Sequence, residues 1–276
     1  MVYTEALPLT PAEIDARYVA VKSVAQEAAR LGMDYYLRRQ SLAVMHKGDD
    51  MQDVVSIADK EIETFIRAEL TKCFPEDGFL GEEGGADDLD ARCIWVIDPI
   101  DGTSCFVNGL HNWCVSIGLL VAGEPLLGAI ADPNHDELFH GCRGRGAFVN
   151  DTPLKVSLAQ DVREGVLGVG TTHRRGKENF IPFLQGLLNE GGMFLRNGSG
   201  ALMTAYVAAG RLIGYYETDL KSWDCLAGLV LLKEAGGRVN DFFRNDGLLH
   251  GNPCLVACPG VYDQVARLIG PSLDQD

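Results

Sequence analysis

A run of apolar residues at 94–97 ends abruptly at two aspartates, Asp98 and Asp101, within the sequence WVIDPIDGTSCF. Such a run is typical of a buried strand, so both carboxylates stand where that strand ends. Their like charges raise the cost of ionising both, and a charge buried beside an apolar segment is unfavourable unless it is paired or binds a metal. No lysine or arginine lies between the two aspartates. We therefore expect a bound cation between these carboxylates.

The residues around this strand end favour a hard cation and a phosphate. The sequence holds no cluster of histidine or cysteine arranged for a softer metal, and oxygen ligands together with substrate phosphate are the usual setting of Mg²⁺. Gly102, Thr103 and Ser104 follow; if a helix begins there, its free backbone N–H groups bind a phosphate at the same place. This combination predicts a phosphoryl-transfer site in which the Thr103 hydroxyl orients an attacking water.

The chain is strongly acidic, with 39 Asp and Glu residues against 24 Lys and Arg and a formal net charge of −15 over 276 residues. This balance argues against a nucleic-acid backbone as the main partner. The 8 cysteines include no CxxC pair, which predicts reduced thiols in a cytoplasmic protein. The N-terminus shows no signal-peptide pattern, and no apolar run approaches the roughly 20 residues that span a bilayer, so we expect neither secretion nor a membrane partner.

The first half of the chain predicts long helices followed by short strands. Residues 10–13, Thr-Pro-Ala-Glu, form a capping box with proline at the first helical position, so a helix begins there. A second helix follows Asp59 and ends before Pro75, which places Asp59 at its start. We expect a linker of mixed charge at 86–92. Segments at 114–123, 125–133 and 146–151 predict a mostly antiparallel sheet.

The pattern changes beyond about residue 150. Strand-like segments at 166–170, 212–217 and 253–258 alternate with helix-like segments at 180–190, 201–211 and 224–237, as in an α/β unit. We therefore expect two lobes, an α+β lobe over residues 1–150 and an α/β lobe over residues 151–276. No flexible linker separates them, so the lobes are expected to pack closely.

Acidic clusters stand next to several apolar segments: Asp53 with Asp59, Glu82 with Glu83, Asp98 with Asp101, and Asp224 ahead of the helix-like CLAGLVLLKEAGG. In so acidic a chain, a solvated turn is the ordinary interpretation of any one such cluster. The pair at the strand end is different because burial leaves its carboxylates without water.

Three motifs in order resemble the inositol monophosphatase family, a group of Mg²⁺-dependent, lithium-sensitive phosphomonoesterases. WVIDPIDGTSCF is similar to the family's W-x-I-D-P-I-D-G-T-x-N-F, SWDCLAGLVLLKEAGG to its W-D-x-A-A-x-x-x-x-x-E-A-G-G, and GEEGG at 81–85 to its upstream Glu-Glu element. The similarity covers about residues 53–258. It implies the layered αβαβα fold of the sugar phosphatases, in which residues 1–150 carry most metal ligands and residues 151–276 carry Asp224 and the substrate side.

The resemblance also implies metal ligands position by position. Glu82, Asp98 and the carbonyl of Ile100 would hold the first Mg²⁺, and Asp98, Asp101 and Asp224 would hold the second. A third, weaker ion would interact with Glu82 through water. The expected cofactors are thus two Mg²⁺ ions, with room for a third.

Catalytic and substrate roles follow from the same resemblance. Thr103 with Glu82 would position the attacking water, and Asp59 would hydrogen-bond Thr103. The amides of Gly102 and Thr103 would hold the phosphate, and Lys47 is similar to a family lysine near the metal loop. The residues expected to contact substrate, with Gly198 beside them, are Gly102, Thr103, Ser199, Glu217 and Asp224.

The implied reaction is in-line displacement of an alcohol by water, with no covalent protein intermediate. The resemblance favours inositol 1-phosphate, a small phosphorylated alcohol, as substrate and a homodimer as the assembly. Histidinol phosphate is the alternative, which an extra acidic group near its cationic amine would favour. Nucleotide or fructose bisphosphates would need a second phosphate site, for which the basic THRRGK at 172–177 is the one candidate. A non-catalytic regulatory protein would have lost metal ligands, all of which are present.

The chain departs from the family pattern at a few places. Cys105 stands where asparagine is usual, Cys225 and Leu226 replace small residues, and HKGDDMQD at 46–53 carries one extra residue. None of these departures removes a metal ligand. We expect them near the pocket wall, where they would bear on the choice of substrate.

Overall fold

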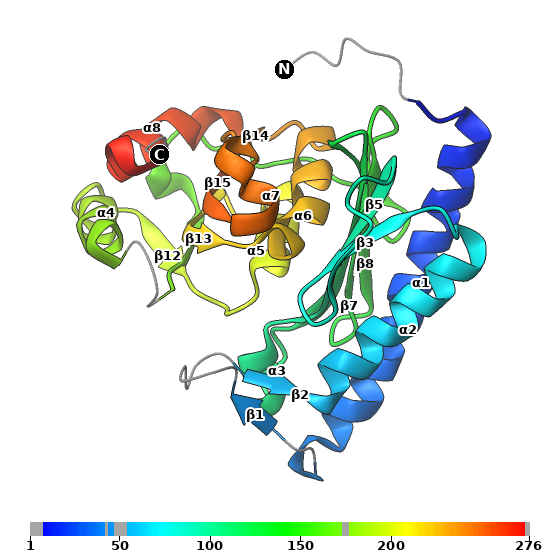
Figure 1. The fold of residues 1–276 in the computed structure, drawn as a ribbon. Coiled ribbons are helices and arrows are strands. Elements are labelled where there is room, and N and C mark those ends of the chain that lie inside the picture. The colour runs from blue at the N-terminus through cyan, green and yellow to red at the C-terminus, as the bar shows by residue number, and fades with distance from the viewer. Residues whose placement is uncertain (1–7, 42–43, 47–53, 173–176, 274–276) are drawn as a thin grey trace.

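The computed structural model describes residues 8–41, 44–46, 54–172 and 177–273. Its elements form five layers that alternate between helices and sheets, from α1 at one side of the molecule to α8 at the other (Figure 1). Lys47, Asp53 and most of the basic 172–177 stretch lie outside the described residues. The predicted αβαβα architecture is confirmed.

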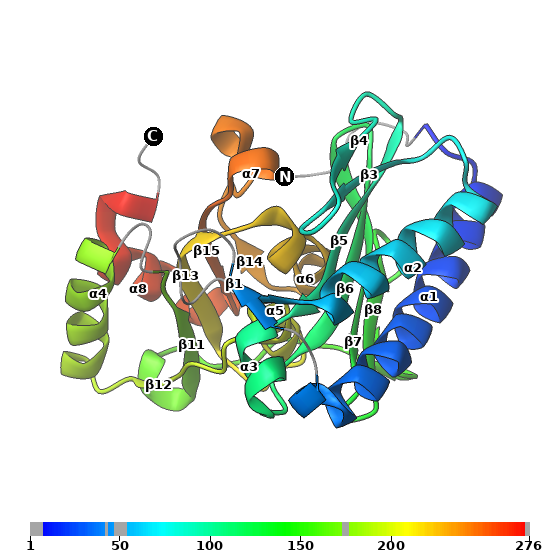
Figure 2. The same cartoon turned by 60° about the horizontal axis from the view of Figure 1, so that its bottom comes forward.

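The first layer consists of two long helices, α1 (Pro11–Leu37) and α2 (Ile57–Cys73). The Thr10 capping box is present: the Glu13 amide donates to Thr10 Oγ1 at 3.3 Å, and the Thr10 amide donates to Glu13 Oε2 at 2.7 Å. Asp59 lies in the first turn of α2, and that helix ends two residues before Pro75, as predicted. Figure 2 shows the two helices side by side against the large sheet.

The large sheet has the strand order β10-β9-β8-β7-β6-β5-β3-β4 and is antiparallel except where β3 runs parallel to β5. Its strands are β3 (Gly78–Gly81), β4 (Gly85–Asp87), β5 (Cys93–Asp101), β6 (Cys114–Val121), β7 (Glu124–Asp132), β8 (Glu137–Cys142), β9 (Ala147–Val149) and β10 (Thr152–Pro153). The linker predicted at 86–92 was partly wrong, because Ala86 and Asp87 belong to β4. This edge strand is fully exposed, so its sequence lacks the alternation of a packed strand.

The middle layer contains α5 (Gly200–Ala208) and α6 (Ser222–Glu234), which pack between the large sheet and a second sheet. Both helices are buried nearly all round, as their uniformly apolar sequences require. The prediction that Asp224 precedes its helix was wrong. The helix begins at Ser222, and Asp224 Oδ2 in its first turn accepts a hydrogen bond from the Lys221 amide at 3.2 Å.

The second sheet has the order β12-β11-β13-β15-β14, and α4 (Lys177–Asn189) and α8 (Pro259–Ile269) cover its outer face. Its strands are β11 (Val166–Gly170), β12 (Met193–Leu195), β13 (Gly214–Leu220), β14 (Arg238–Val239) and β15 (Asn252–Ala257). The strand predicted at 212–217 starts later and extends three residues further. That extension brings Asp219 into β13.

Short elements complete the described chain. The hairpin of β1 (Val44–His46) and β2 (Val54–Ser56) lies near α3 (Thr103–Asn108) at one end of the molecule (Figure 1). The remaining pieces are α7 (Gly247–His250) and the 3₁₀ turns Arg39–Ser41, Val162–Glu164, Arg244–Asp246 and Gly270–Leu273. No helix among the described residues combines the length and apolarity needed to cross a bilayer.

Candidate active site

All nine residues of β5 are buried, and two of them are the aspartates of the DPID sequence. Asp98 is 1% exposed and Asp101 is 7% exposed. The pairing of β5 with β6 shifts register between these two residues, which is the irregularity of a bulge. The Ile100 amide donates to Asp98 Oδ1 at 3.0 Å within this bend. Both carboxylates therefore lie at the same end of the strand, as predicted.

Asp224 reaches this strand end from the first turn of α6. One carboxylate oxygen from each of Asp98, Asp101 and Asp224 lies within 4.8 Å of the others. Burial raises the pKa of Asp98 and of Asp224 well above its ordinary value, and the charges of the neighbouring carboxylates raise it further. In the described part of the chain, no lysine or arginine forms an ion pair with any of the three. This all-oxygen donor set fits a divalent cation such as Mg²⁺.

Glu82 lies just beyond β3 and is half-buried. Its amide donates to the carbonyl of Ile97 at 3.2 Å, which ties this loop to the end of β5. Its charge contributes to the raised pKa of Asp98 and Asp224, and it lines the same cavity. Its carboxylate is not among the three that gather within 4.8 Å. The first-ion set of Glu82, Asp98 and Ile100 therefore stays a prediction.

Asp101 is held by residues at the start of α5 in the middle layer. Its Oδ2 atom accepts hydrogen bonds from Ser199 Oγ at 2.5 Å and the Ala201 amide at 2.6 Å, and its Oδ1 atom accepts one from the Gly200 amide at 3.2 Å. Burial raises the pKa of Asp101, whereas these hydrogen bonds lower it. Ser199 is 1% exposed and caps α5. Its hydroxyl thus donates to Asp101, and because Ser199 also lines the cavity, its contact with substrate stays a prediction.

Thr103 begins α3 and contacts two of the predicted site residues. Its hydroxyl lies within hydrogen-bond distance of Asp59 Oδ1 at 3.1 Å and of the Ile100 carbonyl at 3.0 Å. Gly102 precedes the helix with φ of 95°, and no side chain caps the helix start. A Cβ atom on Gly102 would lie 2.5 Å from the carbonyl oxygen of Asn112. Glycine is thus needed here both for the backbone angle and for space.

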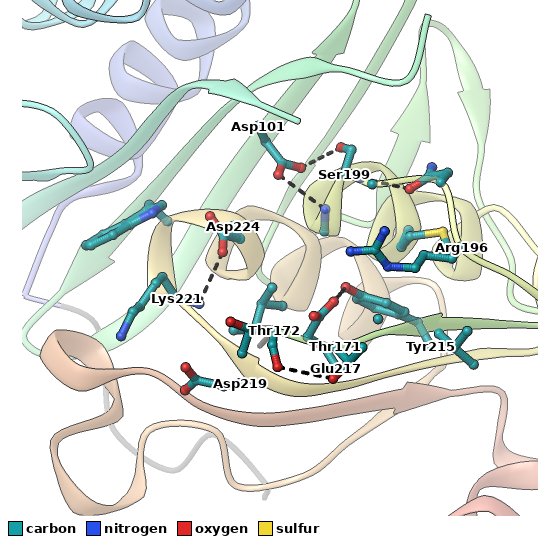
Figure 3. Close-up of a pocket in the computed structure, with 18 of the residues that line it drawn as sticks. Asp101, Thr171, Thr172, Arg196, Ser199, Tyr215, Glu217, Asp219, Lys221 and Asp224 are labelled. Carbon is teal, nitrogen blue, oxygen red and sulfur yellow. Dashed lines mark hydrogen bonds between the residues drawn. The ribbon is translucent and has the colours of Figure 1, made fainter. Parts of the chain in front are cut away.

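A cavity of about 520 Å³ opens beside the carboxylates. Figure 3 shows Asp101 and Asp224 on one side of it and a polar wall from the second sheet on the other. That wall comprises Tyr215, Glu217 and Asp219 of β13 together with Thr171 and Thr172 just after β11, and Arg196 and Lys221 also line the cavity. Sequence reasoning identified only Glu217 among these. The alternation of Tyr215, Glu217 and Asp219 along one strand was a signal that could have revealed the face.

Glu217 lines the polar wall beside Tyr215. Burial raises its pKa to about 7, even though a hydrogen bond from the Tyr215 hydroxyl and the nearby charge of Arg196 lower it. The charges of Asp101 and Asp219 act in the opposite direction and raise it. Glu217 is therefore partly protonated near neutral pH.

Cys105, Cys225 and Leu226 lie behind the cavity wall, whereas the departure at 46–53 falls mostly outside the described residues. Cys105 is buried, and its thiol donates to the carbonyl of Asn197 at 3.3 Å. Cys225 and Leu226 are fully buried, and Leu226 fills the space beside Gly118. None of the three lines the cavity. Their direct effect is on packing between the layers.

Comparison with known proteins agrees with this geometry. The model of the Inositol monophosphatase family matches residues 14–271. The inositol-1-monophosphatase of Rhizobium meliloti (strain 1021) is 38% identical over 231 residues, which is 83% of each chain. The Nus factor SuhB of Pasteurella multocida (strain Pm70) is 35% identical over 261 residues, covering 94% of this chain and 97% of its own.

A solved structure gives the same result. The extragenic suppressor protein suhB from Bartonella henselae superposes with a TM-score of 0.85 at 33% identity, over 94% of this chain and 98% of that one. Sequence and structure therefore agree over almost the entire length, and this chain belongs to the inositol monophosphatase family.

Proposed function

We propose that this protein hydrolyses a small phosphate monoester in a Mg²⁺-dependent reaction, with inositol 1-phosphate as the favoured substrate. The observation that carries the proposal is the gathering of three carboxylates within 4.8 Å at the side of a cavity of about 520 Å³. A relative named inositol-1-monophosphatase, 38% identical over 231 residues, supports the choice of substrate.

Asp98, Asp101 and Asp224 would hold one Mg²⁺, and Asp98 with Glu82 and the Ile100 carbonyl would hold another. Bound Mg²⁺ would supply a Lewis acid that polarises phosphoryl oxygens and offsets their charge. A third ion near Glu82 remains part of the proposal.

Thr103 would orient the attacking water. Its hydroxyl proton is directed toward Asp59 and the Ile100 carbonyl, so the oxygen atom can only accept a further hydrogen bond. A water that donates one proton to Thr103 and the other to Glu82 has its lone pair turned away from both. This arrangement would direct the lone pair to phosphorus, in line with the leaving alcohol, so no covalent protein intermediate is needed.

The substrate would lie between the two lobes. The amides of Gly102 and Thr103 at the uncapped start of α3 would donate to phosphate oxygens. Glu217 on the opposite wall would accept hydrogen bonds from hydroxyl groups of the alcohol part. Ser199 would act indirectly, by holding Asp101 in place.

The assembly and location are also proposals. The edge strand β12 exposes Met193, Phe194 and Leu195 in a row, which supports a homodimer that covers them. All 8 cysteines are unpaired, which supports a reducing, cytoplasmic setting. The division into lobes at residue 150 is also a proposal. The exact boundary is approximate, since β10 of the large sheet lies just beyond residue 150.

A second candidate function comes from relatives named Nus factor SuhB. Their 35% identity over 94% of this chain supports a role as a Nus factor beside catalysis. The net charge of −15 argues against direct contact with a nucleic-acid backbone in such a role. The complete carboxylate cluster favours catalysis as the primary function.

Phosphate release tests the proposal. The purified protein with Mg²⁺ is assayed on inositol 1-phosphate, histidinol phosphate, fructose 1,6-bisphosphate and adenosine 3′,5′-bisphosphate, with a chelator as the metal-free control. We expect metal-dependent release from a monoester and little from the two bisphosphates. Absence of release from all four, from folded protein, would overturn the proposed function.

A further inference from the structure

The polar wall of the cavity comes largely from one face of β13. Tyr215, Glu217 and Asp219 alternate along the strand, and all three line the cavity. The pairing of β13 with β15 shifts register between Glu217 and Leu220, so the strand is irregular where Asp219 lies. Figure 3 shows Asp219 across the cavity from Asp101. An acidic side chain thus faces the space that the alcohol part of a substrate would fill.

The carboxylate of Asp219 has unused capacity to accept hydrogen bonds. It is half-buried, and within the described ranges no hydrogen bond or ion pair engages it. Two cationic side chains line the same cavity, but neither pairs with it. Lys221 Nζ donates to the carbonyl of His250 at 2.6 Å. Arg196 is exposed, and its charge acts on Glu217.

The neighbouring Glu217 indicates which kind of ligand group Asp219 would bind. Asp219 is one of the charges that raise the pKa of Glu217, so the two carboxylates repel each other across the wall. A neutral hydroxyl that donates to either carboxylate leaves the repulsion in place. A cation between them removes it. Side chains two residues apart on a strand are separated by roughly 6–7 Å, which suits an ammonium group that donates to both.

We propose that Asp219, together with Glu217, binds a protonated amine in the alcohol part of the substrate and so selects phosphate monoesters of amino alcohols. This inference rests on the proposed phosphatase function and, among phosphate monoesters, favours an amino-alcohol ester over inositol 1-phosphate. Asp219 is the specificity-determining residue, because Glu217 already receives a hydrogen bond from Tyr215 and the field of Arg196. Asp219 has neither.

The test compares two substrates that differ only in the amine. Histidinol phosphate and its deaminated analogue, imidazolylpropyl phosphate, are assayed at neutral pH with wild type and Asp219→Asn. Asp151→Asn removes the same charge from the exposed turn between β9 and β10 and is the matched control. We expect wild type and the control to prefer the amine by roughly 10-fold or more in kcat/KM, since a charge-assisted hydrogen bond contributes that much.

In Asp219→Asn this preference should fall at least several-fold toward unity, through a higher KM for the amine. Equal rates for both substrates in wild type, or a preference that survives in Asp219→Asn, would overturn the amine subsite while the phosphatase function stands.

A binding measurement keeps the two proposals separable. Calorimetric titration of histidinol and of its deaminated analogue into the Mg²⁺-loaded protein needs no turnover. Tighter binding of histidinol that depends on Asp219 would support the subsite even if no substrate is hydrolysed. Absence of hydrolysis would overturn only the catalytic function. Equal affinity of the two alcohols would overturn the subsite.

Discussion

The Asp101 carboxylate at the end of β5 accepts a hydrogen bond of 2.5 Å from the hydroxyl of Ser199, 98 residues further along the chain. The same carboxylate accepts hydrogen bonds from the amides of Gly200 and Ala201 at the start of α5. A buried carboxylate of the large sheet thus caps a helix of the middle layer, where the helix dipole favours a negative charge. The contact joins these two layers at the proposed metal site.

Replacing Ser199 should therefore affect both stability and metal affinity. Ser199→Ala removes the hydrogen bond to Asp101 and the cap on the Leu202 amide, and we expect a loss of about 2 kcal/mol in unfolding free energy. Half-saturation with Mg²⁺ should need more metal, because Asp101 is held less firmly. Urea denaturation and Mg²⁺ titration of activity measure the two effects. Ser199→Thr keeps the hydroxyl and should retain both the unfolding free energy and the Mg²⁺ affinity. An unchanged Mg²⁺ requirement in Ser199→Ala would contradict the positioning role.

Glu217 predicts a specific pH dependence of stability. Its pKa is about 7 in the folded protein, above the ordinary value of 4.5. The folded state therefore holds this proton more tightly than the unfolded state. The stabilisation that protonated Glu217 gives to the fold is complete below pH 4.5 and is lost as pH rises through 7. Integrated over that range, the loss is up to about 3 kcal/mol.

Denaturation of metal-free protein at pH 4.5 and pH 8 measures this loss. The decline in unfolding free energy should be smaller in Glu217→Gln than in wild type, because glutamine does not titrate. Tyr215→Phe serves as a comparison, since it removes the hydrogen bond to Glu217 and keeps the carboxyl group. Identical declines in wild type and Glu217→Gln would rule out a raised pKa at this position.

Gly102 should tolerate no side chain. Its φ of 95° disfavours any L-residue, and a Cβ atom would lie 2.5 Å from the Asn112 carbonyl oxygen. We expect Gly102→Ala to lose more than about 1 kcal/mol of stability and most of its activity, because the start of α3 must move. Gly85→Ala is the matched control: its φ is also positive, at 66°, but no atom lies within 4 Å of the added Cβ. Thermal melts and phosphate release distinguish the two, and equal losses in both variants would show that space at Gly102 is not limiting.

Local patterns predicted much of this molecule. The capping box at Thr10, the second helix around Asp59 and the strand that ends at Asp98 each depend on neighbouring residues, so periodicity and capping rules identify them. The layered fold followed from ordered motifs that resemble a known family, and the comparisons bear it out.

Other features depend on contacts between distant segments and have no local signal. The Ser199 hydroxyl turns to Asp101 because folding brings the start of α5 against the end of β5, which spacing alone does not reveal. The strand around Glu217 looked complete at residue 217, because polar residues that face a cavity interrupt the apolar run. Asp219 was consequently missed, although it lies two residues from a predicted site residue.

Asp98 provides the most direct test of the metal cluster. It is 1% exposed, and burial beside Asp101 and Asp224 makes its charge unfavourable without a cation. Asp98→Asn keeps the shape and removes one charge. We expect turnover to fall by several orders of magnitude, because the proposed ligand shared by two ions is lost. The fold should persist, which circular dichroism checks.

The same variant should respond oppositely in metal-free and metal-loaded protein. With a chelator at neutral pH, Asp98→Asn should melt at a higher temperature than wild type, because the raised pKa of the native carboxyl means that its ionisation destabilises the fold. With saturating Mg²⁺ the order should reverse, since ligand binding stabilises wild type in proportion to its affinity. Asp151→Asn, in an exposed turn, should follow wild type in both conditions. Near-normal turnover in Asp98→Asn, or an equal Mg²⁺-induced shift in melting temperature, would show that this cluster does not hold the metal.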